Sequence, residues 1–196
     1  MVEKMSELEV FLEGEYCNLI ALNEELVWSS SWYGWFNNLE STKGTEHHRF
    51  PNTRALQLKF FQEEVTGRKD NLILGITELD EGKLVGVISL SSINYVDRKA
   101  NIAIMIGEEK YRSVSIALDA HKMLIAHGFD ELNLHRICGG TIAKEWAEVL
   151  CRSLGFSLEG VLVKDQYKNG EYRDVYQFAL LREKYVALKE ENQYSN

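Results

Sequence analysis

The segment Ala100–Leu124 reads ANIAIMIGEEKYRSVSIALDAHKML and decides the fold. Its first part, IAIMI at residues 102–106, is apolar at every position, which is typical of a strand buried on both faces of a sheet. After Gly107 the run stops, and from Ile116 onward the apolar residues recur at helical spacing. The segment therefore predicts a buried strand, a short loop and a helix.

The loop Tyr111–Ser115 leads main-chain N–H groups into the start of this helix. A helix N-terminus carries unpaired donors and a partial positive charge, so it can bind a phosphate group. An ordinary strand-to-helix turn with Ser115 as the N-cap explains the same residues. The loop alone leaves both interpretations open.

A resemblance to a known family favours the phosphate site. Arg112-Ser113-Val114-Ser115-Ile116-Ala117 resembles the acetyl-CoA pyrophosphate loop of GNAT-superfamily N-acetyltransferases, Arg/Gln-x-x-Gly-x-Gly/Ala, with a serine at the central glycine. Four further strings extend the resemblance: IMIGE before the loop, NLHRI at 133–137, LGF at 154–156 and YKNGEYRDV at 167–175. Together they are similar to the branch that holds ribosomal-protein N-terminal, polyamine and amino-sugar acetyltransferases.

The resemblance implies acetyl-CoA as co-substrate, bound by the six residues of the loop. It also implies that main-chain groups of Ile104, Met105 and Ile106 polarise the thioester, and that Lys144 lies near CoA. Ser115 is the doubtful position: at a positive φ, strain of about 1–3 kcal/mol would weaken CoA binding, whereas a negative φ accommodates serine.

The proton-transfer residues depart from the family pattern. The glutamate that accepts the ammonium proton in the family corresponds to Asn101, which cannot do so. The tyrosine that protonates the leaving thiolate corresponds to Cys151, whose thiol has a suitable ordinary pKa of about 8.5 but could equally be a small core residue. Glu108 is the first candidate base because it follows the strand directly, ahead of Glu109, His135, His47 and His48.

The resemblance implies that the acceptor substrate lies against the first two helices and their connection. Trp35 belongs to a tryptophan-rich stretch that is either core or an aromatic wall. His47, His48 and Arg49 lie in the connection, which is either a substrate-binding loop or a solvated one. The string RFPNT at residues 49–53 resembles a segment of the family's sugar-amine acetyltransferases.

The rest of the chain predicts an α+β fold. Two hairpins, 71–93 and 156–181, carry turn sequences at Asp80-Glu81-Gly82 and Asn169-Gly170. A strand at 134–140 should lie parallel to the first strand, and a helix should span 144–153. The resemblance implies a GNAT-like, mostly antiparallel sheet of about seven strands with a splayed parallel pair and about four helices. We expect a flexible lead-in at 1–14, one domain at 15–182 and a polar tail at 183–196.

Composition narrows the partners. The 196 residues carry a net charge of −8, which opposes a nucleic-acid or anionic-membrane surface. The three cysteines show no metal or disulfide spacing, and neither a signal peptide nor a membrane span is evident, so a cytoplasmic protein without metal is expected. A homodimer is possible through the final hairpin.

These features predict an acetyl-CoA-dependent N-acetyltransferase that acts on a primary amine of a small molecule, foremost an amino sugar or a nucleotide-linked amino sugar. Polyamines and protein N-termini of the ribosomal type are alternatives. A CoA-binding or regulatory module that has lost turnover is an alternative of another class.

Overall fold

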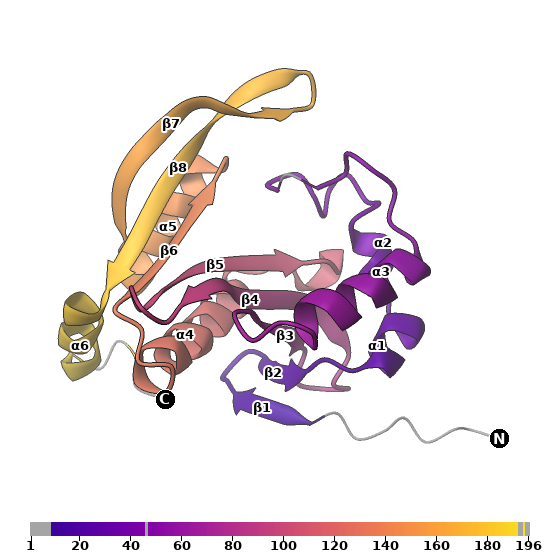
Figure 1. Ribbon diagram of the computed structural model, residues 1–196, viewed down its shortest axis with the longest axis horizontal. Coiled ribbons are helices and arrows are strands. Elements are labelled where there is room, and N and C mark those ends of the chain that lie inside the picture. The colour runs from indigo at the N-terminus through magenta and orange to yellow at the C-terminus, as the bar shows by residue number, and fades with distance from the viewer. Residues whose placement is uncertain (1–8, 46, 192–193, 195–196) are drawn as a thin grey trace.

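The computed structural model describes residues 9–45, 47–191 and 194. One open sheet of eight strands has the order β1-β2-β3-β4-β5-β6-β8-β7 (Figure 1). The strands are β1 (Val10–Glu13), β2 (Asn18–Ala21), β3 (Leu72–Thr77), β4 (Leu84–Asn94), β5 (Lys99–Ile106), β6 (Arg136–Thr141), β7 (Ser157–Lys168) and β8 (Glu171–Leu181). The helices are α1 (Glu24–Ser29), α2 (Trp32–Trp35), α3 (Arg54–Phe60), α4 (Val114–Asp130), α5 (Lys144–Leu154) and α6 (Arg182–Glu190), with a π-helical turn at Phe61–Val65 and a 3-10 turn at Glu109–Tyr111.

The predicted α+β fold is confirmed, including both hairpins. Every neighbouring pair of strands is antiparallel except β5 and β6. Asn169 and Gly170 have φ values of 51° and 86°, which is the left-handed pair that a two-residue hairpin turn requires. The sheet has one strand more than expected, because β1 pairs with β2.

The parallel pair is short and then opens. Pairing runs only from Lys99↔Arg136 to Asn101↔Cys138, although β5 continues to Ile106 and β6 to Thr141. Figure 1 shows the two strands diverging, with β6, β8 and β7 turned away from the rest of the sheet. This splay was expected from the resemblance, and it leaves one edge of β5 open.

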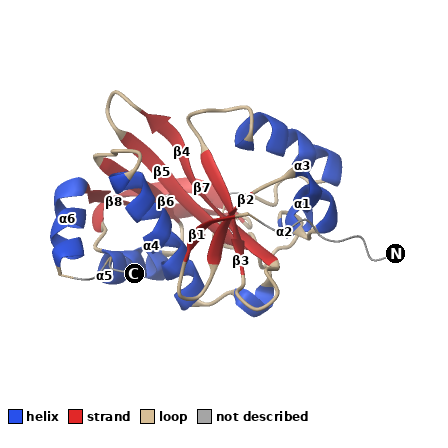
Figure 2. Cartoon of the chain, turned by 90° about the horizontal axis from the view of Figure 1, so that it is seen from below, coloured by secondary structure: helices blue, strands red, loops and turns tan. Residues whose placement is uncertain are grey.

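Apolar side chains cover both faces of the sheet. Consecutive residues of β2, Leu19 and Ile20, are fully buried in different clusters, as the alternation of side chains along a strand dictates. The cluster around Leu19 includes residues of α4 and α5, and the cluster around Ile20 includes residues of α1 and α2. Figure 2 shows α4 to α6 gathered apart from α1 to α3.

The two chain ends correct the predicted boundaries. Residues 10–13 form β1, so the expected flexible lead-in is wrong there, while residues 1–8 lie outside the described part. The expected polar tail contains α6, whose Tyr185 is fully buried. Tyr194 is also buried, and its hydroxyl donates to the Leu154 carbonyl at 2.8 Å. Strand β1, helix α6 and Tyr194 are therefore all held against the domain.

Candidate active site

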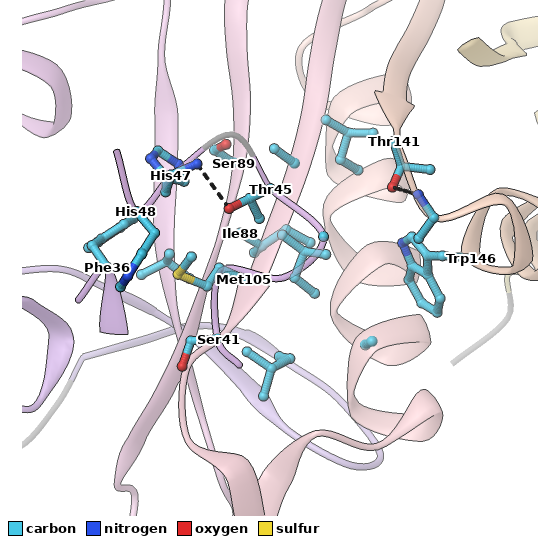
Figure 3. Close-up of a pocket in the computed structure, with 18 of the residues that line it drawn as sticks. Phe36, Ser41, Thr45, His47, His48, Ile88, Ser89, Met105, Thr141 and Trp146 are labelled. Carbon is cyan, nitrogen blue, oxygen red and sulfur yellow. Dashed lines mark hydrogen bonds between the residues drawn. The ribbon is translucent and has the colours of Figure 1, made fainter. Parts of the chain in front are cut away.

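A crevice of about 1350 Å³ opens where β5 and β6 diverge. Strands β4 and β5 form its floor, and residues at the ends of α4 and β6 and on α5 form one half, which we call the cofactor half. The other half, the acceptor half, is formed by α2, α3, the loop between them and β7–β8. Figure 3 shows Thr141 and Trp146 on one side and Phe36, His47 and His48 on the other.

The open edge of β5 presents main-chain groups to the crevice. The Gly107 amide donates to the Val85 carbonyl of β4, so residues of the same parity, including Met105, also pair with β4. The alternate residues Ile104 and Ile106 direct their main chain toward β6 instead. The family resemblance implies the same role for Ile104, Met105 and Ile106, but the main chain of Met105 pairs with β4 and is not available to a ligand. Ile104 is the central open position.

The start of α4 supplies further donors. Ser113, and not Ser115, is the N-cap: its side chain accepts from the Ile116 amide at 3.2 Å. The amides of Val114 and Ser115 have no protein acceptor in the described structure. Four of the six predicted loop amides are paired within the protein, those of Arg112, Ser113, Ile116 and Ala117. The phosphate site thus rests on two amides.

Ser115 adopts helical geometry inside the first turn of α4, and it is not among the residues with positive φ. The strain considered for a serine at this position is therefore absent. Glycine is not required here because the chain has already entered the helix.

The Arg112 side chain is hydrogen-bonded to other groups of the protein. Its guanidinium donates to the main-chain carbonyls of Ile106, at 3.2 Å, and Gly107, at 3.0 Å, and to the Ser41 hydroxyl at 2.7 Å. Arg112 therefore joins the end of β5 to the acceptor loop, in addition to any contact with phosphate.

Glu108 and Trp35 pair with each other outside the lining of the crevice. The Trp35 indole donates to the Glu108 carboxylate at 3.0 Å, and the Lys83 ammonium donates to it at 2.8 Å. Burial opposes ionisation of Glu108, but these two donors outweigh burial and hold its pKa below the usual value. The carboxylate is occupied structurally, which argues against its expected role as base, and Trp35 belongs to the core.

Cys151 and Lys144 lie at a separate small pocket of about 300 Å³ beside β7. Burial raises the pKa of the Cys151 thiol, and Lys144 approaches Glu148 at 3.9 Å. Neither residue lines the crevice. The structure therefore gives no support to Cys151 as the acid or to Lys144 as a CoA ligand.

The predicted residues His47, His48 and Arg49 do line the acceptor half. Arg49 donates to the Tyr167 carbonyl at 3.2 Å, and Lys168 donates to the His47 carbonyl at 2.7 Å. These contacts tie the loop to the tip of the β7–β8 hairpin, which arches toward it in Figure 1. The two elements together close the acceptor half.

The sequence interpretation missed His121 and Trp146, which line the cofactor half with their rings 5.8 Å apart. His121 is buried, and burial lowers its pKa to about 4. Its Nδ1 lies 2.8 Å from the Ala117 carbonyl, which can only accept, so Nδ1 carries the proton and Nε2 is an acceptor. Only the placing of α4 against α5 reveals this pair.

Splayed parallel strands beside a helix N-terminus with unpaired amides give this α+β protein a crevice that can hold an extended, phosphate-bearing ligand. The family model described as "Acetyltransferase (GNAT) domain" matches residues 19–157, and the chain belongs to this family.

Curated relatives agree with this membership. Spermidine N(1)-acetyltransferase of Escherichia coli K12 is 33% identical over 109 residues, covering 55% of this chain and 58% of the relative. The Bacillus subtilis protein YdaF, provisionally named a ribosomal N-acetyltransferase, is 33% identical over 113 residues, covering 57% of this chain and 61% of the relative. The chain thus aligns with about three fifths of these relatives.

Solved structures share the fold. Spermidine N-acetyltransferase from Vibrio cholerae, in complex with CoA and spermine, superposes with a TM-score of 0.77 at 22% identity, over 87% of this chain and 98% of that one. The microcin C7 self-immunity acetyltransferase MccE, with acetyl-CoA and AMP, gives 0.74 at 20% identity, over 90% and 97%.

The described residues contain no group of three or more His, Cys, Asp and Glu side chains arranged for a metal ion. None of the helices in this part of the chain is long and apolar enough to cross a membrane.

Proposed function

We propose that this protein transfers the acetyl group of acetyl-CoA to a primary amine of a small molecule. One observation carries the proposal: the open main-chain edge of β5 at Ile104 and Val114, whose amide is unpaired, line one crevice, and the unpaired amide of Ser115 follows Val114 directly in the chain. The first fits a carbonyl and an extended amide chain, and the second fits a phosphate. Acetyl-CoA contains all three groups in series.

The residues have separate tasks in this proposal. The main chain at Ile104 stabilises the negative charge that develops on the thioester oxygen as the amine attacks. The amine nitrogen forms a bond to the carbonyl carbon, the carbon–sulfur bond breaks, and the proton lost by the amine balances the one gained by the thiolate. Neither Glu108 nor Cys151 has a proton-transfer role in this proposal, since neither lines the crevice.

Polyamines are the acceptors that the curated relatives favour, because the E. coli relative is named for spermidine. The amino-sugar substrate expected from the sequence gains no support from these names. Two buried donors without an acceptor, Trp32 Nε1 and Gln57 Nε2 in the acceptor half, nevertheless favour an acceptor with oxygen functions. A homodimer and a cytoplasmic location stay predictions.

Calorimetric titration with acetyl-CoA, followed by CoA thiol release with spermidine, glucosamine and a ribosomal-type peptide, tests the proposal. We expect saturable binding and release with at least one small amine. Tight binding without release from any amine would favour the turnover-deficient module. Absence of binding at millimolar acetyl-CoA would refute both functions.

A further inference from the structure

Two buried donors in the acceptor half have no acceptor. Trp32 is fully buried and Gln57 is 2% exposed, and both line the crevice. The Nε1 atom of Trp32 and the Nε2 atom of Gln57 have no hydrogen-bond partner among the described residues. A buried N–H without an acceptor is costly, and native structures seldom retain one without a functional reason. These two atoms therefore point to a ligand.

The orientation of the Gln57 amide follows from its neighbours. Asn52 Nδ2 lies 2.8 Å from Gln57 Oε1 and 3.3 Å from the main-chain carbonyl of Tyr33. Because the Tyr33 carbonyl can only accept, the Asn52 atom is the donating NH₂ group, and the Gln57 atom that it meets is the oxygen. The free end of Gln57 is therefore the NH₂ group, and both unpaired groups are donors.

The two donors belong to one wall. Trp32 lies on α2 and Gln57 on α3, and the ring of Phe60, one helical turn after Gln57, packs edge-on against the Trp32 ring at 6.2 Å. Both nitrogen atoms are shielded from solvent, so a ligand oxygen can pair with them only after side-chain adjustments of the kind common on binding. Two neutral donors in an apolar wall require oxygen lone pairs, with no requirement for charge.

We propose that the acceptor substrate carries a hydroxyl, carboxylate or carbonyl oxygen that accepts hydrogen bonds from Trp32 Nε1 and Gln57 Nε2, and that these residues select for it. This inference rests on the proposed acetyl transfer. The charged ammonium groups of a polyamine are donors only and leave both N–H groups unpaired. The site therefore favours amines that carry an oxygen function, because only these pair the two donors that are unpaired in the free protein.

The test compares glucosamine with cyclohexylamine, two primary amines on six-membered rings, and adds spermidine. In Trp32→Phe we expect kcat/KM for glucosamine to fall about tenfold, the loss of one hydrogen bond, and that for cyclohexylamine to stay within about twofold. The melting temperature should stay the same or rise, because a buried unpaired donor has been removed.

Gln57→Glu keeps the oxygen that accepts from Asn52 and replaces the donor by an acceptor. We expect glucosamine to become a poorer substrate and spermidine a better one. Trp28→Phe and Gln62→Glu are the matched controls, because both residues lie outside the crevice lining, and they should not change the ratio between amines.

Equal losses for glucosamine and cyclohexylamine in Trp32→Phe would overturn the oxygen subsite while leaving acetyl transfer intact. Absence of CoA release with every amine would refute the proposed function instead. In that case the oxygen subsite is tested by the rise in melting temperature that glucosamine alone produces. A smaller rise in Trp32→Phe than in the wild type supports the subsite, and an equal rise overturns it.

Discussion

The two halves of the crevice are built from different parts of the chain. The cofactor half offers the main chain of Ile104 and the unpaired amide of Val114, followed by that of Ser115, whereas the acceptor half offers the side chains of Trp32 and Gln57. A main-chain site survives many substitutions because the backbone supplies the donors, and only its geometry must hold. A side-chain site is lost with a single residue. Family resemblance can therefore predict the cofactor half of the crevice, but it does not predict which acceptor substrate the other half selects.

The largest effect should come from the junction between the halves. A Cβ added to Gly107 would lie 1.9 Å from Trp35, whose ring is packed in the core and hydrogen-bonded to Glu108. We expect Gly107→Ala to lower the free energy of unfolding by about 3 kcal/mol, measured by urea denaturation.

Gly34→Ala is the matched control on α2, since its added Cβ meets nothing within 4 Å. It should be neutral or stabilising by up to about 1 kcal/mol, because alanine favours a helix over glycine. A stable Gly107→Ala protein would show that the two halves are not rigidly joined.

The next effect concerns the buried imidazole of the cofactor half. Burial lowers the pKa of His121 to about 4 from an ordinary 6.5, so below pH 6.5 the unfolded chain binds a proton that the folded chain does not. Stability should therefore fall by roughly 2 kcal/mol from pH 7 to pH 5 through this residue.

His121→Gln should remove that share of the pH dependence, as measured by urea unfolding at both pH values. The partly buried His127, whose pKa burial also lowers, is retained in both proteins and cancels in the difference. An unchanged pH dependence in the variant would mean that His121 is accessible to protons in the folded state.

A smaller effect isolates the main-chain donors. Val114 is the first residue of α4, and proline is tolerated there because its missing N–H has no helical partner. The preceding Ser113 has φ −112° and ψ 150°, which proline also permits. We expect Val114→Pro to weaken acetyl-CoA binding about tenfold, the loss of one charge-assisted hydrogen bond, with stability within about 0.5 kcal/mol.

Val114→Ala retains the amide and serves as the control for the exposed side chain in calorimetric titrations. Equal affinities for the alanine and proline variants would contradict a phosphate contact at this amide.

The smallest effect should be at Cys151, which lies outside both halves. Cys151→Ala is expected to leave kcat within about twofold, measured by CoA thiol release. A fall in kcat of tenfold or more would restore the thiol as the general acid.

The parts of the fold that the sequence predicted are those with local signals. The apolar run of β5, the Asn169-Gly170 turn and the helix that Gly155 ends, with φ 75°, all depend on neighbouring residues. The bounds near the ends were misjudged because β1 has only four residues and α6 is mainly polar, and both gain their order from contacts with distant elements. The local periodicity of the sequence does not predict such long-range contacts.

Site residues follow the same division. Trp32 and Trp35 are three positions apart and chemically alike, yet only Trp32 lines the crevice, because the tight packing of Gly107 fixes Trp35 against Glu108. Glu108 is close in sequence to the expected cofactor loop, but Lys83, the residue before β4, pairs with its carboxylate outside the crevice lining. Sequence proximity to the loop therefore did not predict that Glu108 lies outside the crevice.

By itself the sequence determined the order of strands and helices from β2 to β8, the family resemblance and the helix N-terminus at Arg112–Ala117, because hydrophobic period and turn chemistry act over a few residues. Only the tertiary structure decided which loop amides stay unpaired, that His121 meets Trp146, and that Trp32 and Gln57 lack acceptors. These properties depend on which distant groups come within about 3 Å of a donor, and no local pattern encodes that distance.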